Sequence, residues 1–173
     1  AILDSTAINE YLEEAYPNKL HPRDLVLRAI NRSWIEQSNQ STWSAFHLSV
    51  KETENEFISV RDDLFEQFDK LEPSIVGLPF FNGAEFSLVD ASYAPLLQRL
   101  DFLNEIRPGV LDSRRHPKIV AWKNTLLQHK AVKNSCVPDL KELYNELLWK
   151  RQGYISSFLD KTKYDPNVQK SVH

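Results

Sequence analysis

Apolar residues in this chain recur at intervals of three and four positions in one segment after another, which is the periodicity of helices with one buried face. No segment alternates between apolar and polar residues for long enough to predict a β-strand. The chain has nine prolines and only four glycines, and most prolines stand where a helix should begin or end. The sequence therefore predicts an all-α fold, a bundle of about six or seven helices preceded by a small amphipathic helix.

The expected helices follow from caps and apolar positions. They cover residues 4–17, 23–48, 51–71, 87–103, 131–135 and 139–153, and one more begins at Pro117. Residues 37–42 of the second helix are polar and poor helix formers, so we expect a bend or break there. The apolar stripe of this helix is expected to contain Leu27, Ile30, Trp34, Ile35, Trp43 and Phe46.

The composition argues against several classes of protein. A net charge of -3 argues against a nucleic-acid-binding surface, which is normally basic. No apolar run approaches the roughly 20 residues that a membrane span needs, and no signal peptide opens the chain. Cys136 is the only cysteine, so no internal disulfide can form, and the reducing environment of the cytoplasm is expected.

The segment that begins at Ser87 carries the most informative local motif. Ser87 and Asp90 have the spacing of a capping box, in which the serine hydroxyl accepts from the Asp90 N–H and the carboxylate accepts from the Ser87 N–H. The apolar residues that follow predict a buried helix with a kink at Pro95, which removes one backbone donor. On its own the motif indicates only a helix start, and most such boxes are structural.

Sequence patterns do not assemble a complete active site. None of the five histidines pairs with another His, Cys or Glu at the spacing of a zinc site, so no metal is expected. Trp34 and Ser38 are the candidates for a hydrophobic-substrate cleft, because a hydroxyl one turn from a large aromatic ring suits a mixed pocket. Core packing remains the alternative for each aromatic residue. Either the chain is a binding module or its catalytic half lies elsewhere.

The capping box and its flanks resemble one family. Together with residues 80–86 and 98–100, the box is similar to the central buried helix in the C-terminal helical domain of the cytosolic glutathione transferases. Residues 4–14 resemble the last helix of the thioredoxin-like N-terminal domain of that family. The resemblance implies three parts: residues 1–17 as a remnant of the thioredoxin-like domain, residues 18–159 as the C-terminal helical domain, and residues 160–173 as a flexible tail.

The resemblance also implies a ligand. In this family an acidic residue followed by serine opens the last helix of the N-terminal domain and holds the γ-glutamyl end of glutathione. The matching residues here are Asp4 and Ser5. Free N–H groups and a hydroxyl at a helix start bind a carboxylate well, which agrees with that role. The alternative is that both residues are ordinary helix caps. Glutathione is thus the implied co-substrate, with no metal.

For the whole protein the resemblance implies a cytoplasmic homodimer in which the glutathione thiolate attacks a hydrophobic electrophile or reduces a disulfide. This chain would supply the hydrophobic-substrate wall and part of the dimer interface, whereas the residue that activates the thiol lies in the family's N-terminal domain. The chain contains no methionine and is therefore expected to be part of a longer polypeptide. The alternative is a non-catalytic protein–protein interaction module. Related helical domains serve only for assembly in translation-factor subunits, synthetase appendages and a stringent-response regulator.

Overall fold

A computed structural model describes residue 3, residues 5–17 and residues 19–164, and within these residues the regular structure is helical, with no β-strand. The α-helices are α1 (Ser5–Ala15), α2 (Leu25–Val50), α3 (Glu54–Leu71), α4 (Leu88–Ile106), α5 (Pro117–Gln128), α6 (Lys130–Asn134), α7 (Leu140–Arg151) and α8 (Lys161–Tyr164). Two 3₁₀ helices, η1 (Glu72–Ser74) and η2 (Tyr154–Phe158), follow α3 and α7. The all-α prediction is confirmed.

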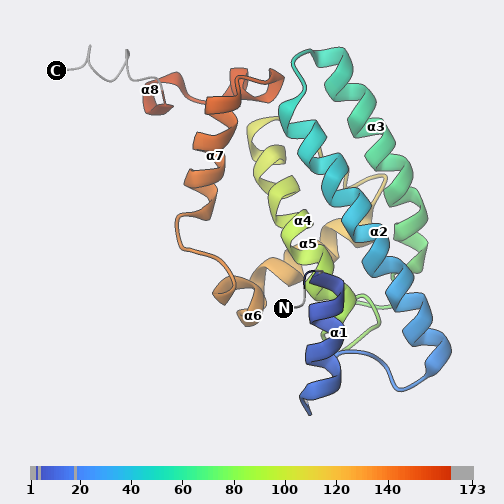
Figure 1. Cartoon of the computed structure of the whole chain (residues 1–173). Coiled ribbons are helices and arrows are strands. Elements are labelled where there is room, and N and C mark those ends of the chain that lie inside the picture. Colours follow the sequence, from blue (N-terminus) through green and yellow to red (C-terminus); the bar gives the residue numbers. More distant parts are fainter. Residues whose placement is uncertain (1–2, 4, 18, 165–173) are drawn as a thin grey trace.

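The helices form a bundle in which α2 packs against α3 and α4 (Figure 1). The helix α4 also packs against α5, while α7 contacts α2 and η2. The centre of the bundle is apolar, and its largest fully buried side chains include Trp122 of α5, Tyr93 of α4 and Phe68 of α3. The core therefore lies between α2, α3, α4 and α5, and α1 contributes no buried residue to it.

The helix α2 is continuous over 26 residues, so it has no break at residues 37–42. Hydroxyl groups in this stretch donate to carbonyls one turn back, from Ser41 Oγ to Gln37 O at 3.1 Å and from Thr42 Oγ1 to Ser38 O at 2.8 Å. Such bonds satisfy the side chains without breaking the backbone ladder. Packing against α3 and α4 then outweighs the weak helix propensity of the stretch.

The buried face of α2 is not the aromatic face that the sequence predicts. Trp43 is 66% exposed and Phe46 is 38% exposed. The buried positions are Asn31, Ile35, Ser38, Ser41, Ala45, Leu48 and Ser49. Small side chains at these positions allow α4 to approach, and the Ser38 hydroxyl lies 2.5 Å from the Ser92 hydroxyl of α4. Side-chain size and hydrogen bonding, rather than hydrophobicity alone, decide which face is buried.

The carboxylate of Asp90 is fully buried and joins three segments. It accepts hydrogen bonds from the Ser87 N–H at 2.7 Å and the Ser87 hydroxyl at 2.5 Å, within the capping box at the start of α4. It also accepts from the Phe81 N–H at 2.9 Å and from the Trp122 indole N–H at 2.6 Å. The capping box is therefore also the junction between the preceding loop, α4 and α5.

None of the eleven residues of α1 is buried, so apolar packing holds this helix only weakly. Carboxylate side chains of α1 make hydrogen bonds to the bundle instead. Glu10 accepts from Arg32 Nε at 3.1 Å and Nη2 at 2.5 Å, and lies 3.0 Å from His21 Nε2. Glu13 accepts from the N–H groups of Leu20 and His21 at 2.9 and 3.0 Å. The Arg32 guanidinium stabilises the ionised form of Glu10 and lowers the pKa of this carboxyl group to about 2.

The substitution Glu10→Gln is expected to weaken the docking of α1 at neutral pH by about 1 kcal/mol, a modest value because solvent screens the half-exposed Arg32. Since the pKa of Glu10 is lowered, its contribution is complete above the ordinary value of 4.5 and is lost as the pH falls toward about 2. Hydrogen exchange of the α1 amides, measured in Glu10→Gln and in the unmodified protein from neutral pH to about pH 3, reports how firmly α1 is docked. The control is Glu66→Gln on the exposed side of α3. If the difference in α1 amide protection between Glu10→Gln and the unmodified protein does not shrink as the pH falls, the ionised Glu10 carboxylate does not hold α1.

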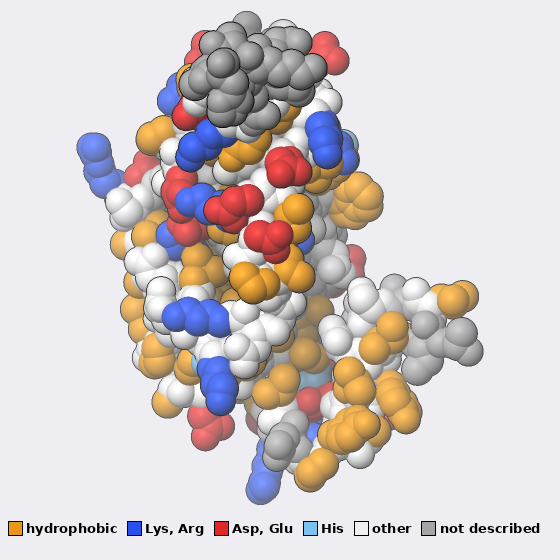
Figure 2. Space-filling view, turned by 90° about the vertical axis from the view of Figure 1, so that its left-hand side faces the viewer, with side chains coloured by type: hydrophobic (Ala, Val, Ile, Leu, Met, Phe, Trp, Pro, Cys, Tyr) orange, Lys and Arg blue, Asp and Glu red, His pale blue; other side chains and the backbone are white. Residues whose placement is uncertain are grey.

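One side of the α1 segment is apolar and open. Its exposed side chains are Ile8, Tyr11, Leu12 and Tyr16, with exposed fractions between 38% and 60%. Figure 2 shows hydrophobic side chains gathered on the lobe at the lower right, which is α1.

Candidate functional site

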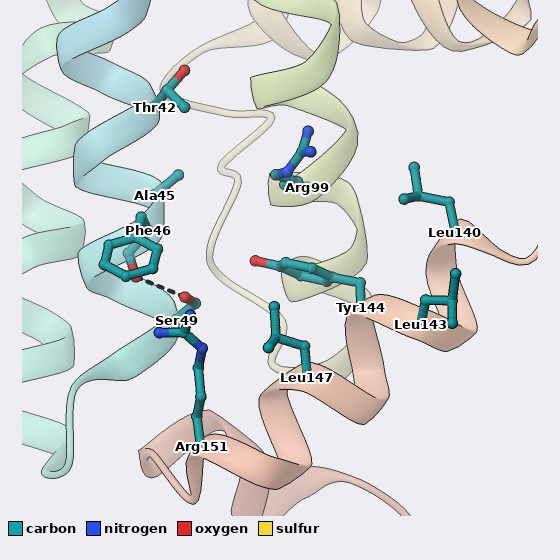
Figure 3. Close-up of a pocket in the computed structure, with 10 residues that line it drawn as sticks. All are labelled: Thr42, Ala45, Phe46, Ser49, Arg99, Leu140, Leu143, Tyr144, Leu147 and Arg151. Carbon is teal, nitrogen blue, oxygen red and sulfur yellow. Dashed lines mark hydrogen bonds between the residues drawn. The ribbon is translucent and has the colours of Figure 1, made fainter. Parts of the chain in front are cut away.

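A cleft opens between α2, α4 and α7 (Figure 3). It has a volume of about 360 Å³ and is lined by Thr42, Ala45, Phe46, Ser49, Arg99, Leu140, Leu143, Tyr144, Leu147 and Arg151. In Figure 3 the α2 residues form one wall, the α7 residues form the facing wall, and Arg99 of α4 lies between them. A mainly apolar lining with a few polar groups is typical of a site for a small hydrophobic molecule.

Five polar side chains interrupt this apolar lining: Thr42, Ser49, Arg99, Tyr144 and Arg151. The Tyr144 hydroxyl points from α7 toward α2 (Figure 3). Burial raises the pKa of Tyr144, and a hydrogen bond with Ser49 and then the charges of Arg99 and Arg151 act against that rise. Arg151 lies over the Phe46 ring, 4.9 Å from its centroid, and Arg99 donates to the Pro95 carbonyl at 2.8 Å. The phenol is therefore protonated at neutral pH, and its hydroxyl is already hydrogen-bonded to Ser49.

A second, open groove runs between the start of α1 and α2. Its lining residues are Ser5, Thr6, Glu36, Asn39, Thr42 and Trp43. Thr42 lines both this groove and the apolar cleft, so the two spaces meet on α2. Ser5 is exposed at the first position of α1. Asp4, its expected partner in binding glutathione, lies outside the described residues.

The two residues that the sequence predicts to face a cleft lie elsewhere. Ser38 is 2% exposed in the interface between α2 and α4, where it bonds to Ser92 and donates to the Ile35 carbonyl at 2.7 Å. Trp34 is half-buried, with its ring centroid 6.2 Å from that of Phe81. Neither residue lines the apolar cleft or the groove, because both belong to the packing between α2 and its neighbours.

Sequence reasoning missed the residues that α4 and α7 supply to the cleft. Arg99, Tyr144 and Arg151 belong to no motif, and each reads as an ordinary residue of an amphipathic helix. Their one signal is spacing, since Leu140, Tyr144, Leu147 and Arg151 recur at three and four positions. That spacing predicts a shared face of α7 but not the helix that the face meets.

Within the described residues, no group of three or more His, Cys, Asp or Glu side chains could hold a metal ion. In the same part of the chain, no helix combines the length and the apolar composition of a membrane span. Cys136 is a free, half-buried cysteine whose thiol lies 3.4 Å from Gln98 Oε1. The apolar cleft and the adjoining groove are therefore the candidate functional sites in the described residues.

The sequence profile described as "Glutathione S-transferase, C-terminal domain" matches residues 24–122, which is more than half of the chain. The chain belongs to the glutathione S-transferase family. The matched segment runs from the N-cap of α2 into α5, so it contains the α2 and α4 walls of the cleft and the buried capping box. The α7 wall lies beyond it.

Relatives of this glutathione S-transferase family member include glutathione S-transferase omega-1 of Sus scrofa, which is 28% identical over 134 residues, 76% of this chain and 54% of that protein. A stringent starvation protein A homolog of Pasteurella multocida (strain Pm70) is 32% identical over 103 residues, 59% of this chain and 49% of that protein. The chain spans about half the length of these curated relatives. The crystal structure of the Tau class glutathione S-transferase from mango, Mangifera indica, shares the fold, with a TM-score of 0.72 at 22% identity over 85% of this chain and 71% of that one.

Proposed function

We propose that this chain is the C-terminal part of a glutathione S-transferase-like protein and supplies the hydrophobic-substrate wall of its active site. The observation that carries the proposal is Thr42, which lines both the groove at the start of α1 and the apolar cleft. Thiol transfer needs such an arrangement, because the glutathione sulfur and the electrophile must lie next to each other. The groove would hold glutathione, and the cleft would hold the hydrophobic electrophile.

In this proposal Asp4 and Ser5 hold the γ-glutamyl end of glutathione. Ser5 supports the assignment because it is exposed and lines the groove. The first turn of a helix offers free N–H groups and the positive end of the helix dipole, both of which favour a ligand carboxylate. Asp4 would meet the ligand's amino group. Glutathione would act as co-substrate, and no residue of this chain is assigned to activating its thiol.

A thioredoxin-like domain packed on α1 would cover the open apolar face of that helix. The exposure of Tyr11 and Leu12, at 55% and 44%, supports such a covering domain. Residues 1–17 would then belong to that domain, residues 18–159 would form the C-terminal domain, and residues 160–173 would be a tail. The complete protein would be a cytoplasmic homodimer that takes its thiol-activating residue from the other domain.

The test uses the full-length protein, assayed for conjugation of glutathione to an aromatic chloride and for retention on glutathione-agarose. Ser5→Ala is expected to raise the KM for glutathione about tenfold with little change in kcat, because the hydroxyl binds a part of the ligand that does not react. The control is Ser157→Ala, which removes an exposed hydroxyl in η2. If the unmodified protein neither binds the resin nor conjugates the electrophile, the proposal fails.

The second candidate function is that of a non-catalytic protein–protein interaction module with the same helical fold. The relative named as a stringent starvation protein A homolog, at 32% identity, favours this alternative. A stable protein partner recovered with the full-length protein, together with the absence of thiol conjugation, would support it. Conjugation that depends on Ser5 would exclude it as the sole function.

A further inference from the structure

The loop between η1 and α4 contains a chemically reactive pair, Asn82 and Gly83. It is the only place in the sequence where glycine follows asparagine. Asparagine is a heat-labile residue, because the backbone nitrogen of the next residue can attack its side-chain carbonyl carbon. Glycine favours this attack, since it has no side chain and restricts the backbone least. Both residues are half-buried, so solvent reaches the pair.

The folded loop holds the nitrogen that would react. The Gly83 N–H donates to the Phe80 carbonyl at 3.1 Å, and the Phe80 N–H donates to the Gly83 carbonyl at 2.9 Å, so the two residues form an antiparallel bridge. Gly83 has a φ of 117°, which fixes it in a conformation that suits glycine. Attack on Asn82 requires this nitrogen to lose its proton and to turn toward the side chain. The closed bridge therefore suppresses the reaction, which proceeds from conformations in which the bridge is open.

The bridge is next to a tightly packed part of the core. Phe81 is 2% exposed, its N–H donates to the Asp90 carboxylate at 2.9 Å, and its ring centroid lies 5.5 Å from that of Trp122. On the other side of the bridge, a Cβ atom on Gly77 would lie only 3.2 Å from the Gly83 Cα. The loop thus has no room for a longer backbone at this point.

We propose that Asn82 is a latent deamidation site, and that opening of the bridge between Phe80 and Gly83 controls its reaction. In the open loop the Gly83 nitrogen bonds to the Asn82 Cγ atom. The bond from Cγ to the side-chain nitrogen breaks, and this nitrogen takes up the Gly83 proton and leaves as ammonia. Water then opens the resulting succinimide at either carbonyl, which gives aspartate or isoaspartate. The net reaction consumes one water and releases one ammonia, without an oxidant or a cofactor.

The modification would prevent the loop from closing again. The succinimide nitrogen has no hydrogen, so the bond to the Phe80 carbonyl is lost, and isoaspartate adds a methylene group to the backbone where Gly77 approaches Gly83. Both final products also place a new negative charge one residue from Phe81, whose N–H serves the buried Asp90 carboxylate. Deamidation therefore weakens the junction between the loop, α4 and α5, and it does so irreversibly. This inference does not depend on the proposed function.

The experiment ages the full-length protein at neutral pH, below its unfolding temperature, and follows each asparagine by peptide mapping and mass spectrometry. We expect Asn82 to convert before any other asparagine, at a rate at least about tenfold below that of a synthetic peptide of residues 79–86, because the loop must first open. The aged protein should unfold at a lower temperature than fresh protein. Asn82→Gln, whose longer side chain disfavours the five-membered ring, should show no such ageing. Equal rates in protein and peptide would show that the bridge does not protect the site, and earlier conversion of another asparagine would overturn the assignment.

Two glycine variants separate opening of the loop from unfolding of the whole protein. Gly77→Ala places a Cβ atom 3.2 Å from the Gly83 Cα and 3.8 Å from the Gly83 nitrogen, so it should displace Gly83 and accelerate deamidation about fivefold, the effect of losing one hydrogen bond. Gly153→Ala puts a Cβ atom 3.0 Å from the Lys51 carbonyl oxygen, far along the chain from the loop, and should change the rate less than twofold.

These variants are informative because deamidation is slow compared with opening and closing, so that its rate follows the population of the open loop. Circular dichroism checks that each variant is folded at the temperature used. Equal acceleration by Gly77→Ala and Gly153→Ala would show that global unfolding, rather than the bridge, exposes the site. If Asn82 stays intact in the unmodified protein and in Gly77→Ala, while the peptide reacts, the proposal is overturned.

Discussion

Replacing Asp90 with alanine is expected to lower the free energy of unfolding by about 3–5 kcal/mol, the largest single effect that we expect in this chain. The fully buried carboxylate accepts four hydrogen bonds, from the N–H groups of Phe81 and Ser87, the Ser87 hydroxyl and the Trp122 indole. Alanine would leave these donors buried without an acceptor, and each unsatisfied donor costs about 1–3 kcal/mol. Urea unfolding followed by circular dichroism measures the loss.

The matched control is the other capping box of the chain, formed by Thr53 and Glu56 at the start of α3. Glu56 accepts from the Thr53 N–H and hydroxyl at 3.1 and 2.8 Å and its box is exposed to solvent, so Glu56→Ala should cost far less than Asp90→Ala. Equal losses for the two variants would show that Asp90 acts only as a helix cap. A much larger loss for Asp90→Ala would instead show that it joins the loop, α4 and α5.

Gly153→Ala is expected to destabilise the protein by about 1–3 kcal/mol. A Cβ atom at this position would lie 3.0 Å from the Lys51 carbonyl oxygen and 3.3 Å from the Ser49 carbonyl oxygen and the Val50 carbonyl carbon. These are backbone atoms at the end of α2, which cannot rotate away as a side chain would. The methyl group would therefore separate η2 from α2 and weaken the bond from the Tyr154 N–H to the Lys51 carbonyl, now 2.6 Å long.

The neighbouring residue, Gln152, provides a control in which glycine should not lower the free energy of unfolding. Gln152 has a φ of 54°, in the left-handed region that glycine adopts without strain. Gln152→Gly should therefore be neutral or raise the free energy of unfolding by up to about 1 kcal/mol. Thermal unfolding of both variants makes the comparison. If Gly153→Ala is as stable as the unmodified protein, the close contact between η2 and the end of α2 does not constrain the fold.

Asp90 and Gly153 also affect the cleft, because each fixes the position of one of its walls. Asp90 sets the start of α4, which carries Arg99, and Gly153 sets the path of the chain that leaves α7, which carries Tyr144 and Arg151. A change at either position is therefore expected to alter ligand binding even though neither residue lines the cleft. Binding of a neutral aromatic probe such as N-phenyl-1-naphthylamine to Gly153→Ala should weaken along with stability, since the α7 wall would move away from α2.

The residues of α2 show how far prediction from sequence extended and where it stopped. The existence of this helix and its end near residue 48 were predicted, because the spacing of its apolar residues is a local signal. The helix does not break at residues 37–42, because serine and threonine hydroxyls bond within the helix. The aromatic stripe was also wrong at Trp43 and Phe46, because small residues on another face let α4 approach more closely.

The sequence by itself determined the helical class, the capping box at Ser87 and Asp90, and the resemblance to the glutathione transferases. Each depends on periodicity, caps or short motifs, which act within one or two turns of the chain. Only the tertiary structure decided that Asp90 also binds Trp122, that Ser38 is buried, and that Arg99, Tyr144 and Arg151 face one cleft. Burial and charge pairing depend on which helices meet, and residues far apart in the sequence fix those contacts.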